Sequence, residues 1–129
     1  MGISLLTSSN SPLFAEIKIA RFNVDATPEI GEPVAYAPVR SIVDPLSARG
    51  VVLLFDNQSP VVLCAVDWIG IYNNGQDVWK AELAKAAGTT PDRVSVHALH
   101  QHDGPRCDFW NGERTSTAGT QFGRNFFQQ

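Results

Sequence analysis

The chain has 129 residues, of which 43 % are hydrophobic and 18 % charged, and its formal net charge is −3. This length suits one ordinary domain, and the apolar fraction is that of a folded globular protein rather than of a disordered chain. With 10 basic against 13 acidic residues and no basic run, the sequence offers no electrostatic footprint for nucleic acid. No apolar stretch approaches the ~20 residues of a membrane-spanning helix, so no transmembrane segment is expected.

Residues 1–13 are predicted to form a flexible lead-in, because they are mostly polar and end beside Pro12. Their short apolar patch has no basic residues ahead of it, so there is no convincing signal peptide and the compartment stays open. The alternation of apolar and polar residues in 14–24 then predicts a strand with one solvated face. Prolines and a glycine break regular structure across 25–38.

Residues 48–56 and 60–71 are the strongest strand candidates. Both are rich in Val and Leu and nearly continuous in hydrophobicity, which is typical of strands buried on both faces. The short polar connection at 56–60 favours a hairpin between them. Within the second run, Cys64 is interpreted as a small buried apolar residue.

After Ile71 the periodicity becomes helical. Asn74 is a candidate N-cap, Asp77 suits the first turn, and Gly88 can end the helix. A turn then leads into a strand over Arg93–Leu99. Strand, helix and strand in this order predict an α/β fold whose mixed sheet contains one βαβ unit.

The ends of these two strands predict a site. Ligands of parallel sheets gather beyond the carboxyl ends of the strands, where the sequence places Asp67 and the histidine cluster. Asp67 could act as an acid or base, or could orient an imidazole. It could equally be an ordinary strand-end cap.

All three histidines lie within six positions, as His97, His100 and His102. Neutral imidazole is a common zinc ligand, and in an extended segment the spacing of two puts His100 and His102 on one face. His97 would face the other way and is the weaker candidate. Asp103 could ligate or orient a ligand, and Gly104 would let the backbone come close to whatever is bound. Ordinary surface histidines on a loop remain the alternative.

The segment "LHQHDGP" resembles the His-Thr-His-Ser-Gly-Pro signature of neutral/alkaline (non-lysosomal) ceramidases. The family's opening Asp-Ile-Thr-Pro-X-X-Gly segment is similar to "DATPEIG", which matches it at Asp25, Thr27, Pro28 and Gly31. Its strand ending in Asp-Leu-X-Gly is similar to "VVLCAVDWIG". A further similarity covers "DPLSARGVVLLFD", and the order and spacing agree from about residue 18 to 105. Gln101 and Asp103 replace the usual Thr and Ser.

The resemblance implies a zinc-dependent amidohydrolase that cleaves the amide of an N-acyl sphingoid base, a ceramide-like small molecule. It implies His100 as a zinc ligand and His102 as a residue lining the site. We therefore take His100 and His102 as candidate metal residues, Asp67 and His102 as candidate catalytic residues, and Asp103 and Gly104 as their supporting neighbours. Asp103 could also shift the preference toward a cationic or smaller amide.

The family's other zinc ligands come from much further along its sequence. Residues 14–129 are accordingly expected to be the incomplete N-terminal portion of a larger catalytic domain, with the last ~20 residues poorly ordered and the isolated chain inactive. Exposed C-terminal aromatics would invite association. Family relatives are often exported. The alternative is a small non-catalytic α/β module that binds a ligand or partner and keeps a vestigial metal site; the role of Cys107 is open under either hypothesis.

Overall fold

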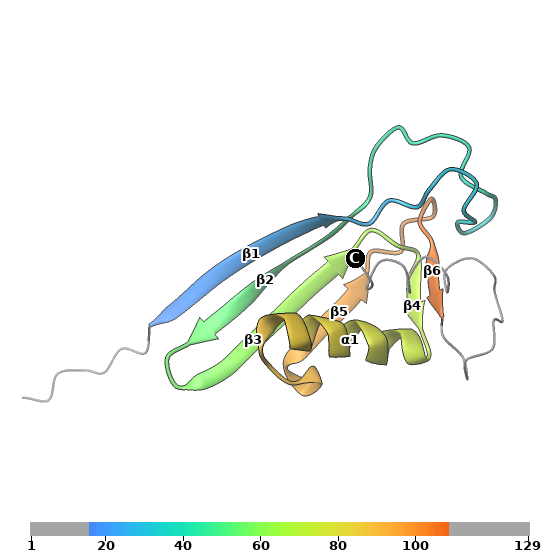
Figure 1. Ribbon diagram of the computed structural model, residues 1–129. Coiled ribbons are helices and arrows are strands. Elements are labelled where there is room, and N and C mark those ends of the chain that lie inside the picture. Colours follow the sequence, from blue (N-terminus) through green and yellow to red (C-terminus); the bar gives the residue numbers. More distant parts are fainter. Residues whose placement is uncertain (1–15, 109–129) are drawn as a thin grey trace, which may run out of the picture.

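The computed structural model describes residues 16–108 (Figure 1). In chain order its elements are β1 (Ile17–Asp25), β2 (Ser47–Phe55), β3 (Gln58–Val66), β4 (Gly70–Tyr72), α1 (Asn74–Ala87), the short 3-10 helix η1 (Pro91–Arg93), β5 (Val94–Ala98) and β6 (Arg106–Asp108). The predicted lead-in 1–13 and the C-terminal ~20 residues, which were expected to be poorly ordered, lie outside the described residues.

The main sheet has four strands in the order β1-β2-β3-β5. β2 pairs antiparallel with β1 and with β3, whereas β3 and β5 are parallel and are connected through α1. This arrangement confirms the predicted α/β fold with a mixed sheet, the hairpin and the βαβ unit. β4 and β6 add a small parallel pair that the sequence did not predict.

Helix α1 ends at Ala87, directly before the glycine that was expected to stop it. Gly88 takes the left-handed conformation at φ 67°, and its N–H reaches back to the last turn, as predicted. The start differs by one position: Asn73 precedes the helix, and Asn74 is already its first residue. The Asn73 side chain donates to the Asp108 carboxylate at 3.0 Å, which connects the start of α1 to β6.

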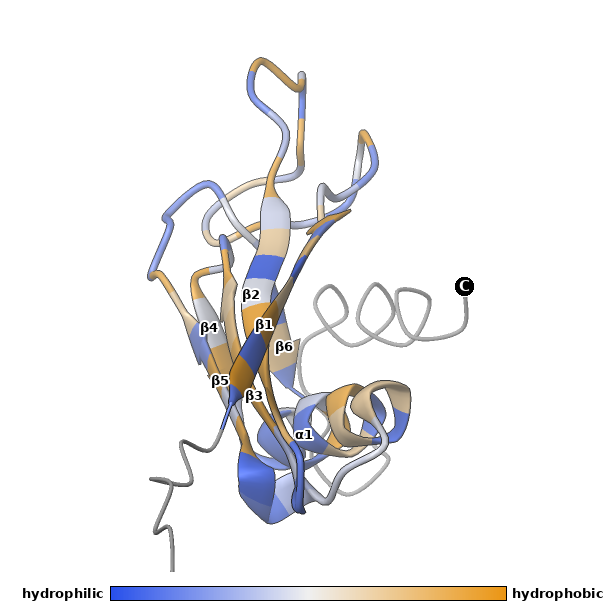
Figure 2. Ribbon diagram, turned by 90° about the vertical axis from the view of Figure 1, so that its left-hand side faces the viewer, coloured by the Kyte–Doolittle hydropathy of each residue, from blue (hydrophilic) through white to orange (hydrophobic). Residues whose placement is uncertain are grey.

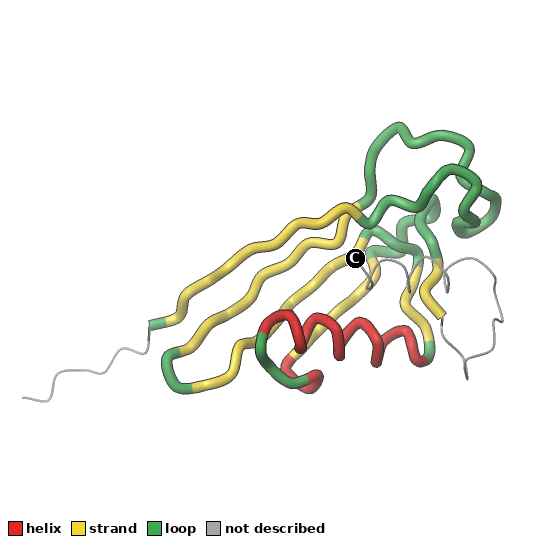
Figure 3. The backbone as a smooth tube through the Cα atoms, in the orientation of Figure 1, coloured by secondary structure: helices red, strands yellow, loops and turns green. Residues whose placement is uncertain are grey.

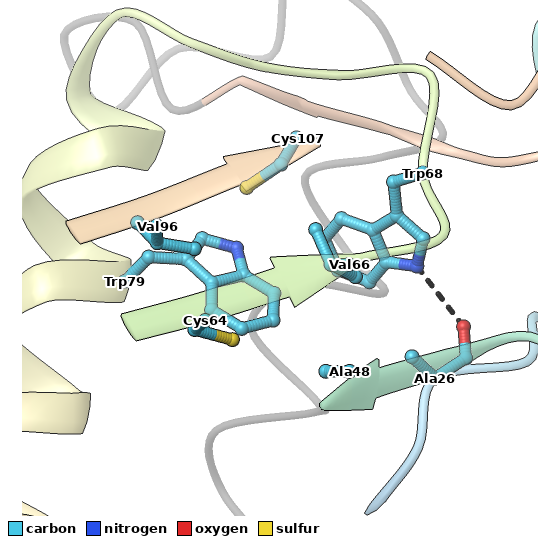
Figure 4. Packing of buried hydrophobic residues seen from close by; sticks show 8 residues of the cluster. All are labelled: Ala26, Ala48, Cys64, Val66, Trp68, Trp79, Val96 and Cys107. Atoms are coloured by element: carbon cyan, nitrogen blue, oxygen red, sulfur yellow. Dashed lines mark hydrogen bonds between the residues drawn. The ribbon is translucent and has the colours of Figure 1, made fainter. Parts of the chain in front are cut away.

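The core lies between α1 and one face of the sheet, as Figure 4 shows. Trp68 and Trp79 meet edge to face with their ring centroids 5.2 Å apart, an arrangement that aromatic pairs favour. The Trp68 indole N–H donates to the Ala26 carbonyl at 3.0 Å, so its one polar group is satisfied. Cys64 is buried in this cluster, as expected, together with Cys107.

The opposite face of the sheet is bare within the described residues (Figure 2). The register places Ile19, Leu53 and Val61 side by side on that face, and the side chain of Ile19 is 64 % exposed. The prediction that β2 and β3 are buried on both faces is therefore wrong for this structure. No helix within residues 16–108 combines the length and apolar character required to cross a membrane.

Candidate functional site

The ends of β3 and β5 form one edge of the sheet, as the sequence predicts, and the loops gather there (Figure 3). Beyond the paired strands, the Leu99 N–H donates to the Val66 carbonyl at 3.0 Å and the Gln101 N–H to the Trp68 carbonyl at 3.2 Å. The Ile69 N–H in turn donates to the Pro105 carbonyl at 3.1 Å. The segment that carries His100 and His102 is thus joined by backbone hydrogen bonds to the segment that follows Asp67.

Gly104 makes this close approach possible. A β-carbon at this position would lie 2.6 Å from the Asp67 carbonyl oxygen and 2.8 Å from the Trp68 α-carbon, both of them backbone atoms that cannot rotate away. Gly104 and Pro105 are buried. Gly104 therefore packs the histidine loop against the end of β3, which is a more specific role than the general closeness predicted for it.

His100 has an unusual backbone and a defined ring orientation. Its φ of 61° lies in the left-handed region, which is strained for a residue other than glycine. Its Nδ1 lies 3.0 Å from the Ile69 carbonyl oxygen. Because a carbonyl oxygen only accepts hydrogen bonds, Nδ1 must be the protonated nitrogen, and the neutral ring then offers its Nε2 lone pair to a ligand.

His102 lies beside His100, with ring centroids 5.0 Å apart and the rings nearly perpendicular. The sequence predicted this proximity from an extended segment, but the chain leaves β5 at Ala98 and turns at 102–103. The turn and the left-handed His100, rather than the alternation of a strand, bring the two rings together. Both residues are exposed, and so is Asp103.

His97 is separated from this pair. It belongs to β5, lies opposite Ala65 of β3, and is exposed on the bare face of the sheet. The sequence placed it on the other face of a strand that continued to His102, but the strand ends at Ala98, before His100. His97 consequently provides a matched control of the same residue type, three positions from His100.

The Asp67 side chain contacts β2, although its backbone packs against the histidine loop at Gly104. Its Oδ2 accepts hydrogen bonds from the Ser47 N–H and hydroxyl, each at 2.9 Å, and pairs with the Arg49 guanidinium at 3.0 Å. Partial burial favours the protonated acid, but the hydrogen bonds from Ser47 and Arg49 outweigh it and hold the pKa of Asp67 below its usual value. The carboxylate is thus ionised and engaged, which suits a strand-end clamp better than a general base.

The segment between β1 and β2 reaches the histidine loop, where the Tyr36 ring contacts the His102 ring, a contact that the sequence did not predict. The Thr27 N–H donates to Asp25, and the Thr27 hydroxyl both donates to the Leu46 carbonyl at 3.2 Å and accepts from the Leu46 N–H at 2.9 Å. These contacts hold the two ends of the segment together. The "DATP" motif was the sequence signal for the turn at Thr27, because Asp and Thr beside Pro commonly fix a turn through their side chains.

Two hollows flank the histidine loop. One, of about 250 Å³, is lined by Val39, Ile42, Leu46 and Asp103 among others, and a second, of about 280 Å³, by Tyr36, Arg40, His102 and Asp103 among others. The Tyr36 ring meets the His102 ring edge to face at 5.6 Å between centroids. Asp103 is among the residues that line both hollows.

Cys107 does not extend the candidate metal site. It is fully buried on β6, and burial, only partly offset by a hydrogen bond from Trp79, raises the pKa of its thiol to about 12. Zinc binds the thiolate, which is the form that this environment disfavours. Within residues 16–108, no group of three or more His, Cys, Asp or Glu side chains is placed to hold a metal ion.

Comparison with protein-family models and with curated protein sequences gives no match. Among solved structures, the chain is similar to one described as "Ceramidase complexed with C2", with 21 % sequence identity and a TM-score of 0.54. The similarity covers 71 % of this chain and 16 % of that chain. Over that stretch the chain is therefore similar in fold to a part of that ceramidase.

Proposed function

We propose that this chain forms the histidine-bearing part of a ceramidase-like amidohydrolase, which hydrolyses the N-acyl amide of a ceramide-like molecule. The observation that carries the proposal is the pair His100 and His102 at the carboxyl edge of parallel strands, in a ceramidase-like fold. Its substrate class is taken from the ceramidase to which the structure is similar.

The residues fit zinc in part. His100 would bind through Nε2 while its Nδ1–H donates to Ile69, a support that zinc-binding imidazoles usually have. His102 would be the second ligand, with the Tyr36 ring in edge-to-face contact with its ring. Zinc in such a site would supply Lewis-acid activation of water and of the amide carbonyl.

The remaining groups would bind and orient the substrate. The apolar side chains Val39, Ile42 and Leu46 suit the acyl part, and the exposed Asp103 carboxylate would attract a positive charge carried near the amide. Asp67 would act indirectly, because its hydrogen bonds with Ser47 fix the end of β3 against which the histidine loop packs. This role replaces direct acid–base work as the one its contacts favour.

Catalytic zinc commonly has three protein ligands, and residues 16–108 bring together two histidines for it. We accordingly expect the isolated chain to bind zinc weakly and to show no amidase turnover, with further ligands supplied from elsewhere. A non-catalytic module with a vestigial site would share the weak binding. The two hypotheses differ in whether the full natural gene product hydrolyses an N-acyl amide.

The test is a zinc titration of the chain by competition with a chromogenic chelator, in parallel with His100→Ala, His102→Ala and the control His97→Ala. The proposal expects each of the first two variants to weaken zinc binding by more than about tenfold. Removing a residue that only supports a metal ligand already weakens binding by about that factor, and removing the ligand itself should weaken it more. His97→Ala should bind like the parent chain.

Equal binding by all four proteins, or none in a folded chain, would contradict the assignment of the metal. Amidase activity is tested separately, as release of the amine from a short-chain N-acyl sphingoid base by the full natural gene product. Zinc bound through the pair without any such release would favour the non-catalytic module.

A further inference from the structure

The segment between β1 and β2 has a defined backbone of its own. At its base, the Ala26 N–H donates to the Leu46 carbonyl at 3.0 Å. Further out, the Gly31 N–H donates to the Val39 carbonyl at 2.9 Å, and the Val39 N–H donates to the Glu32 carbonyl at 2.8 Å. Backbone hydrogen bonds therefore join the two arms of this segment at its base and again near its tip.

Tyr36 lies at the tip of the segment. The Val34 N–H donates to the Ala37 carbonyl at 3.2 Å, and this hydrogen bond encloses residues 35 and 36. The Tyr36 ring meets the His102 ring edge to face, with the centroids 5.6 Å apart and an interplanar angle of 72°. Both side chains also line the hollow of about 280 Å³ beside the histidine loop. This contact connects the segment to the candidate site.

The Tyr36 side chain is not part of the core. It is 73 % exposed, and the buried clusters within residues 16–108 do not include it. Single exposed aromatic residues are common on protein surfaces and by themselves indicate no function. Tyr36 differs from such a residue because its ring contacts an imidazole of the candidate metal pair.

The two histidines of the pair are oriented in different ways. The His100 ring is fixed by the hydrogen bond between its Nδ1 and the Ile69 carbonyl. The His102 ring is exposed, and the contacts given for it among the described residues are aromatic, with Tyr36 and with His100. An exposed side chain exchanges among staggered rotamers, and a ligand then binds with an affinity reduced by the fraction of the competent rotamer. A contact that favours this rotamer therefore strengthens binding.

We propose that Tyr36 is a positioning residue for His102, because its ring favours the imidazole rotamer that lies beside His100. The two histidines bind the metal, and the segment between β1 and β2 assists them through this one ring. The effect on zinc rests on the proposed function, whereas the contact itself is present without metal. An aromatic pair favours the paired arrangement by about two- to tenfold, and this is the size of the expected effect.

The first measurement uses the metal-free chain. The imidazole proton resonances of His102 are identified by their loss in His102→Ala and compared in the parent, Tyr36→Phe and Tyr36→Leu. The ring current of Tyr36 shifts these resonances, so Tyr36→Phe should keep the shift and Tyr36→Leu should lose it. Ile30→Ala, which truncates a 61 % exposed side chain of the same segment, is the control and should leave them unchanged. The His97 resonances should be the same throughout.

The second measurement is zinc affinity, by the same competition with a chelator. Tyr36→Leu should bind zinc about two- to tenfold more weakly than the parent chain, because His102 spends less time in the competent rotamer. Tyr36→Phe and Ile30→Ala should bind like the parent. Urea denaturation should give all four proteins the same stability, since Tyr36 and Ile30 are exposed, so a loss of affinity would not reflect unfolding.

His102 resonances that are the same in the parent and in Tyr36→Leu would overturn the proposal. So would a zinc affinity that Tyr36→Leu leaves unchanged, or one that Tyr36→Phe lowers as much as Tyr36→Leu, because the hydroxyl rather than the ring would then matter. If the parent binds no zinc, the proposed function fails by itself, and the imidazole resonances still decide whether Tyr36 orients His102.

Discussion

Asp67 and His100 leave neighbouring strands at the same edge of the sheet, yet their side chains are held in opposite ways. The Asp67 carboxylate is occupied by Ser47 and Arg49, whereas the His100 ring makes one hydrogen bond, through Nδ1, and His102 lies exposed beside it. A polar group that makes its hydrogen bonds within the protein adds to stability, whereas a group with an unused donor or acceptor is available to a ligand. The comparison separates the residues that stabilise this edge of the sheet from those that can bind a ligand there.

The strongest way to break this edge is Gly104→Ala. The added methyl group would overlap the backbone of Asp67 and Trp68, so we expect the free energy of unfolding to fall by about 3 kcal/mol, at the upper end of overpacking effects. Urea denaturation followed by tryptophan fluorescence measures the change. Zinc binding should fall with it, because both sides of the comparison depend on this contact.

Gly31→Ala is the matched control for Gly104→Ala. Gly31 has φ 90° and no atom near its missing side chain, so only backbone strain of about 1–2 kcal/mol is expected. Equal losses in the two variants would show that the close approach at Gly104 is not tight.

Asp67→Asn tests the engaged side of the comparison. It removes the charge from three hydrogen bonds and should lower the free energy of unfolding by about 2 kcal/mol at pH 7, with zinc affinity unchanged. Because the pKa of Asp67 is lowered in the folded state, its contribution is complete above the unfolded value of about 3.9 and is lost as the pH falls through the folded pKa.

The difference between the parent chain and Asp67→Asn should therefore be constant from pH 7 to 5 and close in more acidic solution. Urea denaturation across this range measures it, with Asp56→Asn in the exposed β2–β3 turn as the control. A loss of zinc binding in an Asp67→Asn chain that remains stable would instead show that Asp67 takes part in zinc binding.

The smallest expected effect distinguishes two replacements of His100. Both His100→Gly and His100→Ala lose the ring and should lose zinc alike. Because φ is 61°, the glycine variant should be more stable than the alanine variant by about 1 kcal/mol. Thermal unfolding of the two proteins provides the measurement, and equal stability would show that the loop relaxes out of the left-handed conformation.

Much of the fold could be predicted from local pattern. The Val- and Leu-rich runs identify β2 and β3, and Gly88 marks the end of α1 because only a few residues adopt its backbone conformation readily. The end of β3 could not be found in this way. The apolar run continues through Trp68 to Ile71, and the break is set by contacts of Asp67 with β2 and of Ile69 with Pro105.

The proximity of His100 and His102 could be predicted from the sequence, but the backbone geometry that produces it could not. Spacing placed His100 near His102, but the bend that joins them depends on Gly104 fitting against β3, a contact between distant parts of the sequence. The exposed face of the sheet was missed for a related reason. A continuous apolar run reports that a strand can be buried on two sides, not which layers the chain supplies.

The position of β1 at the margin of the main sheet has a consequence for how the chain behaves in concentrated solution. Eight of its nine residues are exposed, and its outer backbone groups are unpaired within the described sheet. A long strand of this kind is a template on which other chains can add in register. Lys18 and Arg21 interrupt its apolar residues with charge, which is one of the devices by which edge strands discourage the addition of further strands.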